Sequence, residues 1–142
     1  MTETYTYLDH TGDLGIRAYG RTLKQLFTHA AHGLLESIAD ANTIDESAQI
    51  KIELTAGSLE DLMVAWLDEL NFRHEVEEMF FRRVDIRSIS EQPPALSAVA
   101  RGETVNFNKH VVYTEIKSVT YHQLSVEQMS DGSWIAQVIF DL

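Results

Sequence analysis

The sequence alternates between apolar and polar residues over most of its length, and only two segments depart from that period of two. Such alternation is typical of β-strands that are buried on one face. About eight segments show it. The strand candidates are residues 4–8, 14–19, 48–55, 80–90, 95–102, 114–119, 124–129 and 134–140. Many short strands close together in sequence favour mostly antiparallel pairing through hairpins.

Two segments have the spacing of a helix. Apolar residues recur at intervals of three and four from Thr22 to Ile38, and again from Ser58 towards Glu77. Thr22 and Ser58 suit helix N-caps, because a hydroxyl can accept a hydrogen bond from an otherwise unpaired backbone N–H. The sequence therefore predicts an α+β fold, a two-layer domain with two helices on a mostly antiparallel sheet.

The chain is expected to form one domain, residues 1–142. Its 142 residues match the size of a single domain, and we find no internal repeat or linker. The longest apolar runs are far shorter than a membrane span, and the first residues lack the features of a signal peptide. We therefore expect a cytoplasmic protein with no membrane partner.

Charge and composition exclude some classes of function and some kinds of site. There are 11 basic and 22 acidic residues, a net charge of −11, which argues against direct gripping of nucleic acid. An acidic surface suits hard cations or a basic protein partner, although it also simply keeps a protein soluble. The absence of cysteine excludes thiol nucleophiles and thiolate metal sites. His29 and His32 fall nearly opposite the apolar face of the first helix, so we expect them to be exposed rather than metal ligands.

The stretch Asp9-His10-Thr11-Gly12-Asp13 places two carboxylates and an imidazole between the first two strand candidates. Two aspartates in a tight loop can converge on one hard cation, and Gly12 allows the loop to turn sharply. The alternative is structural, with Asp9 capping a turn and Asp13 forming an Asx-turn. The residues alone leave both interpretations open.

A second acidic point lies at the other end of the sequence. The last strand candidate is apolar on both faces near its end, which predicts a central place in the sheet. Asp141 follows it, and the main-chain carboxylate of Leu142 adds oxygens if the chain ends there. Together with Asp13 these carboxylates suit Ca²⁺ or Mg²⁺ rather than zinc. The alternative is a solvated strand tip.

Carboxylates gathered without a cation would repel one another. Lys117 is one of only four lysines and is a candidate for the balancing charge. The alternative is that Lys117 is an exposed strand residue in a weak surface ion pair.

Four stretches of the sequence, in order and over essentially its whole length, resemble the archease family. They are the opening at 7–13 (YLDHTGD) with 15–20 (GIRAYG) and Thr22-Leu23, then 61–70 (DLMVAWLDEL), 115–122 (EIKSVTYH) and 138–142 (VIFDL). The departures are small: Gly12 and Ser118 stand where alanine is common, and Asn71-Phe72 replaces a more aliphatic pair. None of them removes an ionisable residue.

The resemblance implies an accessory protein rather than an enzyme, with a fold related to strand-helix-strand-strand domains. Archeases activate RtcB-family RNA ligases in tRNA splicing and RNA repair. They promote metal- and GTP-dependent nucleotidylation of the ligase and multiple turnover. RNA would be engaged only through the ligase. Carried onto this sequence, Asp13, Asp141 and the carboxylate of Leu142 are metal ligands, Lys117 is a functional residue for activation, and the metal is Ca²⁺ or Mg²⁺, with Mn²⁺ also possible.

Two other functions fit the same residues. The first is a stand-alone metal-dependent phosphoesterase, for which only His10 offers a general base beside the carboxylates. The second is a chaperone-like protein-binding module with a purely structural acidic loop. Turnover of a phosphoester by the protein alone would favour the first, and a failure to bind Ca²⁺, Mg²⁺ or Mn²⁺ would favour the second.

Overall fold

The structure is a computed structural model that describes residues 4–10 and 12–142, with the backbone alone described at Asp9 and His10. Within these residues the chain forms eight strands, two α-helices and one short 3-10 helix. The elements are β1 (Tyr5–His10), β2 (Asp13–Gly20), α1 (Leu23–Ile38), η1 (Ala41–Thr43), β3 (Ala48–Thr55), α2 (Leu59–Val76), β4 (Met79–Glu91), β5 (Pro94–Thr104), β6 (Ser118–Val119), β7 (Ser125–Gln128) and β8 (Trp134–Asp141).

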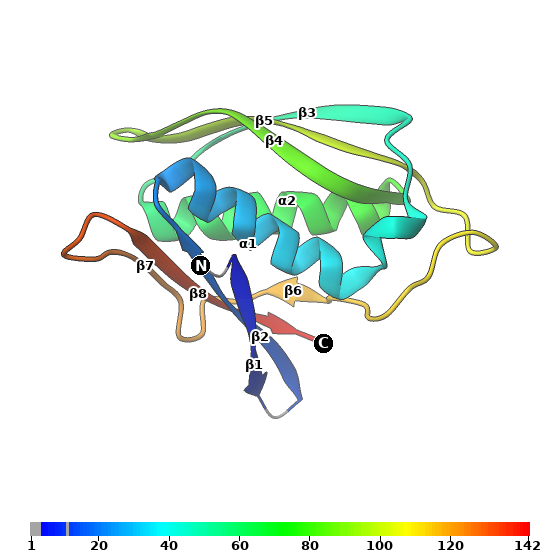
Figure 1. Ribbon diagram of the computed structural model, residues 1–142, viewed down its shortest axis with the longest axis horizontal. Helices are drawn as coiled ribbons and strands as arrows, with labels where there is room; N and C mark the ends of the chain where they lie inside the picture. Colours follow the sequence, from blue (N-terminus) through cyan, green and yellow to red (C-terminus); the bar gives the residue numbers. More distant parts are fainter. Residues whose placement is uncertain (1–3, 11) are drawn as a thin grey trace.

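The strands form two sheets. One is ordered β1-β2-β8-β6, with β7 also paired to β8, and the other is ordered β3-β5-β4. Both sheets are antiparallel throughout the described pairings. The α+β class predicted from the sequence is therefore confirmed. Figure 1 shows both helices lying between the two sheets, so the fold has three layers where alternation had suggested two.

The third layer follows from the width of the buried face of α1. The apolar series predicted one buried stripe, but Ala31, Gly33 and Ser37 are buried beside it. A Cβ added at Gly33 would lie 3.1 Å from Ile16 Cδ1, so α1 packs closely against β2 on this side. On its other side α1 contacts β4. Alternation along the strands carries no information about which sheet each strand joins.

Both predicted N-caps are confirmed. The Thr22 hydroxyl accepts a hydrogen bond from the Gln25 N–H, and the Ser58 hydroxyl accepts one from the Asp61 N–H. Between the sheets, the indole Nε1 of the fully buried Trp66 donates to the Phe27 carbonyl at 2.9 Å and ties the two helices together. Neither helix in the described part of the chain is long and apolar enough to cross a membrane.

The predicted central position of the last strand is also confirmed. β8 pairs with β2 along its whole length on one side, and with β6 and β7 on the other. The neighbouring strand candidate is shorter than expected, because only Ser118–Val119 pairs with β8. Upstream of it, the N–H groups of Tyr113 and Thr114 donate to the Ile38 carbonyl at the end of α1 instead of joining a sheet.

Candidate functional site at the end of the central strand

Asp13 and Asp141 lie directly opposite each other, at the start of β2 and the end of β8. Residues opposed in an antiparallel pair point to the same face, with Cβ atoms about 4.5–5.5 Å apart. Their neighbours in the strands, Leu14 and Phe140, pack towards the helices. Asp13 is half-buried and Asp141 is exposed, so the two carboxylates belong to the outer face of the sheet. The first hairpin and the last strand thus each contribute one carboxylate to the same small area of the sheet surface.

A tight hairpin holds Asp13 in place. His10 pairs with Asp13, which leaves a connection of two residues, and Gly12 has φ = +75°. A positive φ of this kind is characteristic of two-residue hairpins and favours glycine. Thr11 and the side chains of Asp9 and His10 lie outside the described residues, so the roles considered for Asp9 and His10 stay predictions.

A backbone hydrogen bond places Lys117 next to Asp141. Its N–H donates to the Asp141 carbonyl at 2.8 Å, and the next residue, Ser118, is the register partner of Asp141. Two successive residues therefore face one residue of β8, the arrangement of a β-bulge, which sheets use to redirect a side chain. The structure brings Asp13, Lys117 and Asp141 together although they are far apart in the sequence.

Asn71 of α2 fixes the peptide group that precedes Lys117. Its side-chain Nδ2 donates to the Ile116 carbonyl at 2.8 Å. That carbonyl and the Lys117 N–H belong to one peptide group. The bonds from α2 and to β8 clamp this peptide group from two sides. Asn71 is only 3% exposed, and the hydrogen bond from its Nδ2 offsets part of the cost of burying the amide. The sequence did not indicate this role for Asn71.

The side chain of Lys117 is exposed. It takes part in none of the ion pairs formed between described residues, whereas Lys51 pairs with Glu53 and Lys109 pairs with Asp45 and Glu103. Two carboxylates directly opposite each other are mutually destabilising unless positive charge is nearby. An uncommitted lysine beside the pair can offset that charge or bind an anionic group of a ligand.

Three side chains here supply part of the oxygen ligand set that a hard divalent cation needs. Asp13, Asp141 and the Ser118 hydroxyl occupy one row across β2, β8 and β6, and all three side chains offer oxygen. Ca²⁺ and Mg²⁺ prefer such ligands. Among the described residues, no group of three or more His, Cys, Asp or Glu side chains is placed to hold a metal ion. A cation bound here would therefore need further ligands from outside this row of three residues.

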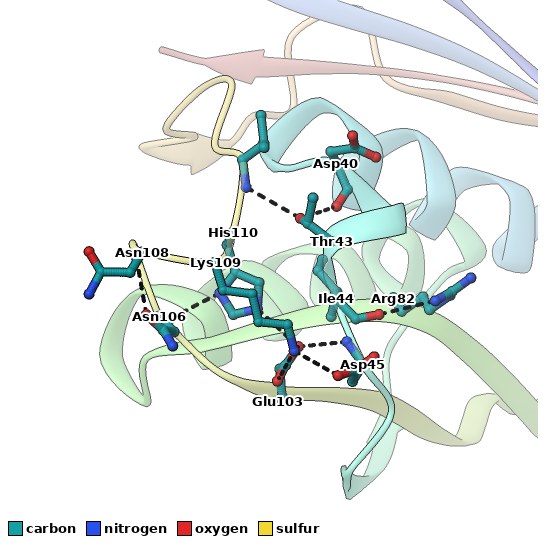
Figure 2. A network of polar contacts seen from close by, with 11 residues as sticks. Asp40, Thr43, Ile44, Asp45, Arg82, Glu103, Asn106, Asn108, Lys109 and His110 are labelled. Carbon is teal, nitrogen blue, oxygen red and sulfur yellow. Dashed lines mark hydrogen bonds and ion pairs between the residues drawn. The ribbon is translucent and has the colours of Figure 1, made fainter.

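A second polar cluster joins the end of β5 to the loop that follows it and was not predicted. Figure 2 shows Glu103 at its centre, with Lys109 Nζ 2.7 Å and His110 Nε2 3.0 Å from Glu103 Oε2. The backbone N–H of Asn106 donates to His110 Nδ1, so the hydrogen of a neutral ring lies on Nε2, facing Glu103. Hydrogen bonds from Lys109, from the Asp45 N–H and from His110 lower the pKa of Glu103 to about 2.

The contacts of this second cluster connect two segments of the fold. It ties the loop after β5 to the start of the segment that leads into β3, since Lys109 also pairs with Asp45 at 2.7 Å. Most of its members lie within residues 103–110, but Asp45 is distant in the sequence and no motif links it to them. Only the fold reveals that they meet.

Comparison with known proteins places the chain in a family. Residues 5–142 match the Archease protein family (MTH1598/TM1083). The chain is 40% identical over 140 residues to the protein archease of Methanosarcina acetivorans, covering 97% of this chain and 95% of that protein. It is 35% identical over 136 residues to that of Methanopyrus kandleri, covering 95% and 96%.

A solved structure agrees with this match. The solution structure of Methanobacterium thermoautotrophicum protein 1598 superimposes with a TM-score of 0.81 at 30% identity, covering 98% of this chain and 99% of that one. The chain therefore belongs to the archease family, as its sequence motifs had predicted.

Proposed function

We propose that this protein is an accessory factor that activates an RtcB-family RNA ligase in tRNA splicing and RNA repair. Membership of the archease family supports the class of function. The observation that supports this site as the functional one is the meeting of Asp13, Lys117 and Asp141 at the end of β8. These are the residues that the family resemblance selects, and they come from three separate parts of the sequence.

The charge of the protein supports a protein partner rather than direct RNA binding. A net charge of −11 repels a phosphate backbone, whose binding depends on lysine and arginine. The same charge attracts a basic protein surface and accelerates its association. The ligase, which must itself bind RNA, is the expected carrier of such a surface.

In this proposal, Asp13 and Asp141 hold a divalent cation, Ca²⁺ or Mg²⁺, with oxygens from the Leu142 carboxylate and the ligase completing the ligand set. A divalent cation bound there would neutralise charge on a phosphoryl group during transfer. Lys117 provides a compact positive charge for phosphate oxygens of the ligase-bound GTP. Asn71 and β8 hold the backbone of Lys117 in place next to Asp141, so that its side chain extends from a fixed point near the carboxylates.

The test is an assay of ligase guanylylation and multiple-turnover RNA joining, with and without this protein. Asp13→Ala, Lys117→Ala and Asp141→Ala should each reduce the stimulation by tenfold or more, while the basal ligase rate stays unchanged. Matched controls are Asp85→Ala on β4 and Lys51→Ala on β3, both in the other sheet and both in surface ion pairs. The controls should stimulate like the wild type.

Normal stimulation by all three site variants would contradict the assignment of this site. Failure of the wild-type protein to stimulate the ligase would contradict the function itself. Phosphoester turnover by this protein alone, lost in the Asp13→Ala variant, would instead support the phosphoesterase alternative.

A further inference from the structure

A groove of about 540 Å³ opens between the end of α2 and the loop that follows β5. Phe80 and Val105 contribute its inner lining, and Val76, Phe107 and Val112 contribute its outer walls. The last three side chains are 63%, 78% and 44% exposed. Contiguous apolar surface of this kind marks interaction sites, whereas scattered exposed apolar residues do not.

The groove is preformed. The ring of His74 stacks on Phe80 with 4.9 Å between centroids, and His110 packs edge-on against the same ring at 4.8 Å. His110 and the neighbouring Lys109 are bound to Glu103, so the polar cluster of Figure 2 anchors the loop that carries Phe107. A rigid groove loses little conformational freedom when a partner binds.

The rim of the groove is acidic. Glu75, Glu78 and Glu115 line it, and no lysine or arginine occurs among the described residues that do so. His74 Nδ1 is hydrogen-bonded to the Met79 carbonyl at 2.8 Å, which fixes the ring against the end of α2. An apolar groove with an acidic rim is complementary to a basic, apolar protein segment and repels nucleic acid.

Glu78 adds an independent indication. It follows the C-cap of α2 with φ = +55°, a left-handed conformation in which helices usually place glycine. Holding a residue with a Cβ there costs roughly 1–2 kcal/mol. The Glu78 carbonyl serves the fold by accepting a hydrogen bond from the Val105 N–H, which glycine would also allow. The carboxylate itself is therefore best explained by its place on the rim.

The groove adjoins the site at the end of β8. Thr114 and Glu115 line the groove, and the clamped peptide group between Ile116 and Lys117 comes next in the chain. Figure 1 shows the loop after β5 running round the ends of the helices into β6, beside the C-terminal end of β8. A segment lying in the groove would thus be placed next to Lys117.

We propose that this groove binds a segment of the ligase in which apolar side chains are flanked by lysine or arginine. This inference rests on the proposed function, because it takes the ligase as the partner. The apolar side chains of that segment cover Val76, Phe107 and Val112, and its cations face Glu75, Glu78 and Glu115. The groove supplies affinity, and the site at Asp13, Lys117 and Asp141 supplies activation.

The test measures binding of the purified ligase to the wild type and to two groove variants by calorimetry and stopped-flow kinetics. Phe107→Ser should raise the Kd by tenfold or more without unfolding the protein, because Phe107 is 78% exposed. Glu78→Gly should lower the association rate at low salt and flatten its salt dependence, while raising the stability of the protein alone. The control is Met129→Ser in the turn after β7, where Met129 is 48% exposed; it should bind like the wild type.

The outcomes separate the two proposals. Asp13→Ala should still bind the ligase through the groove but fail to stimulate it. Wild-type affinity and salt dependence in both groove variants, together with normal stimulation by the wild type, would overturn the groove and leave the proposed function standing. If labelled RNA competed with the ligase for the groove, that result would also overturn the groove proposal. If the wild type neither binds nor stimulates the ligase, both proposals fail.

Discussion

Asp13 and Asp141 face each other across β2 and β8, so the first hairpin and the last strand of the fold meet in one pair of carboxylates. Lys117 is bonded to the backbone of the same Asp141. Neither end of the chain is a site by itself. The opening acidic loop gains its partner only because β8 is the central strand of its sheet.

The carboxylate pair predicts stabilisation by divalent cations. Millimolar Ca²⁺ or Mg²⁺ should raise the Tm of the wild type, because a ligand that binds only the folded state stabilises it by mass action. Asp13→Asn and Asp141→Asn should each abolish most of that shift, whereas Asp85→Asn should preserve it. Differential scanning calorimetry with and without EDTA makes the measurement. Equal shifts in all four proteins would contradict a cation site at this pair.

The clamp on Lys117 predicts a specific effect of Asn71→Leu. The variant should lose about 1–3 kcal/mol of stability, because the Ile116 carbonyl is left buried without its donor. Hydrogen exchange at the Lys117 amide should accelerate by more than the global loss explains. Ser37→Ala is the control, since it removes another buried hydrogen bond, to the Leu34 carbonyl, away from the site. Unchanged relative protection of Lys117 in Asn71→Leu would argue against the clamp.

The first hairpin predicts that Gly12→Ala is costly. A Cβ at φ = +75° should reduce the free energy of unfolding by about 1–2 kcal/mol. Gly12→Asn should cost less, because asparagine tolerates this conformation better. Gly57→Ala is the matched control, with the nearest atom to an added Cβ at 3.9 Å and no positive φ. Denaturant unfolding that shows equal losses at both glycines would contradict the account of the hairpin.

The Glu103 cluster predicts acid sensitivity. Its pKa falls from an ordinary 4.5 to about 2 in the folded protein, chiefly through the hydrogen bond from Lys109. Between these values the unfolded state binds more protons than the folded state, so stability rises with pH. The contribution is fully present above pH 4.5 and is lost as the pH falls towards 2. Glu103→Gln should flatten this part of the stability curve, and the control Glu91→Gln, at the end of β4, should not.

Local patterns predicted the elements well. Thr22 and Ser58 cap the helices as expected, and β3 has the predicted bounds Ala48–Thr55. These features depend on hydrogen bonds and alternation within a few residues, which sequence carries directly. The central position of β8 was also predictable, because its end is apolar on both faces.

Features that depend on which surfaces meet were not predictable. His29 and His32 were expected to be exposed, but both are half-buried, since α1 is covered by sheets on two sides. The His29 ring bonds to the Tyr19 carbonyl, and burial lowers the pKa of His32. The clamp by Asn71 likewise depends on tertiary contact alone. The sequence motifs selected Asp13, Lys117 and Asp141 as site residues. Strand pairing, which the sequence does not show, explains why these residues lie together.

The most direct test of the central claim is a double-mutant cycle on ligase guanylylation with Asp13→Ala, Asp141→Ala and the double variant. If the two carboxylates act as one unit, the double variant should stimulate the ligase no less than either single variant, because removing one partner already disables the pair. Losses that simply multiply in the double variant, or stimulation that survives in all three proteins, would contradict the account.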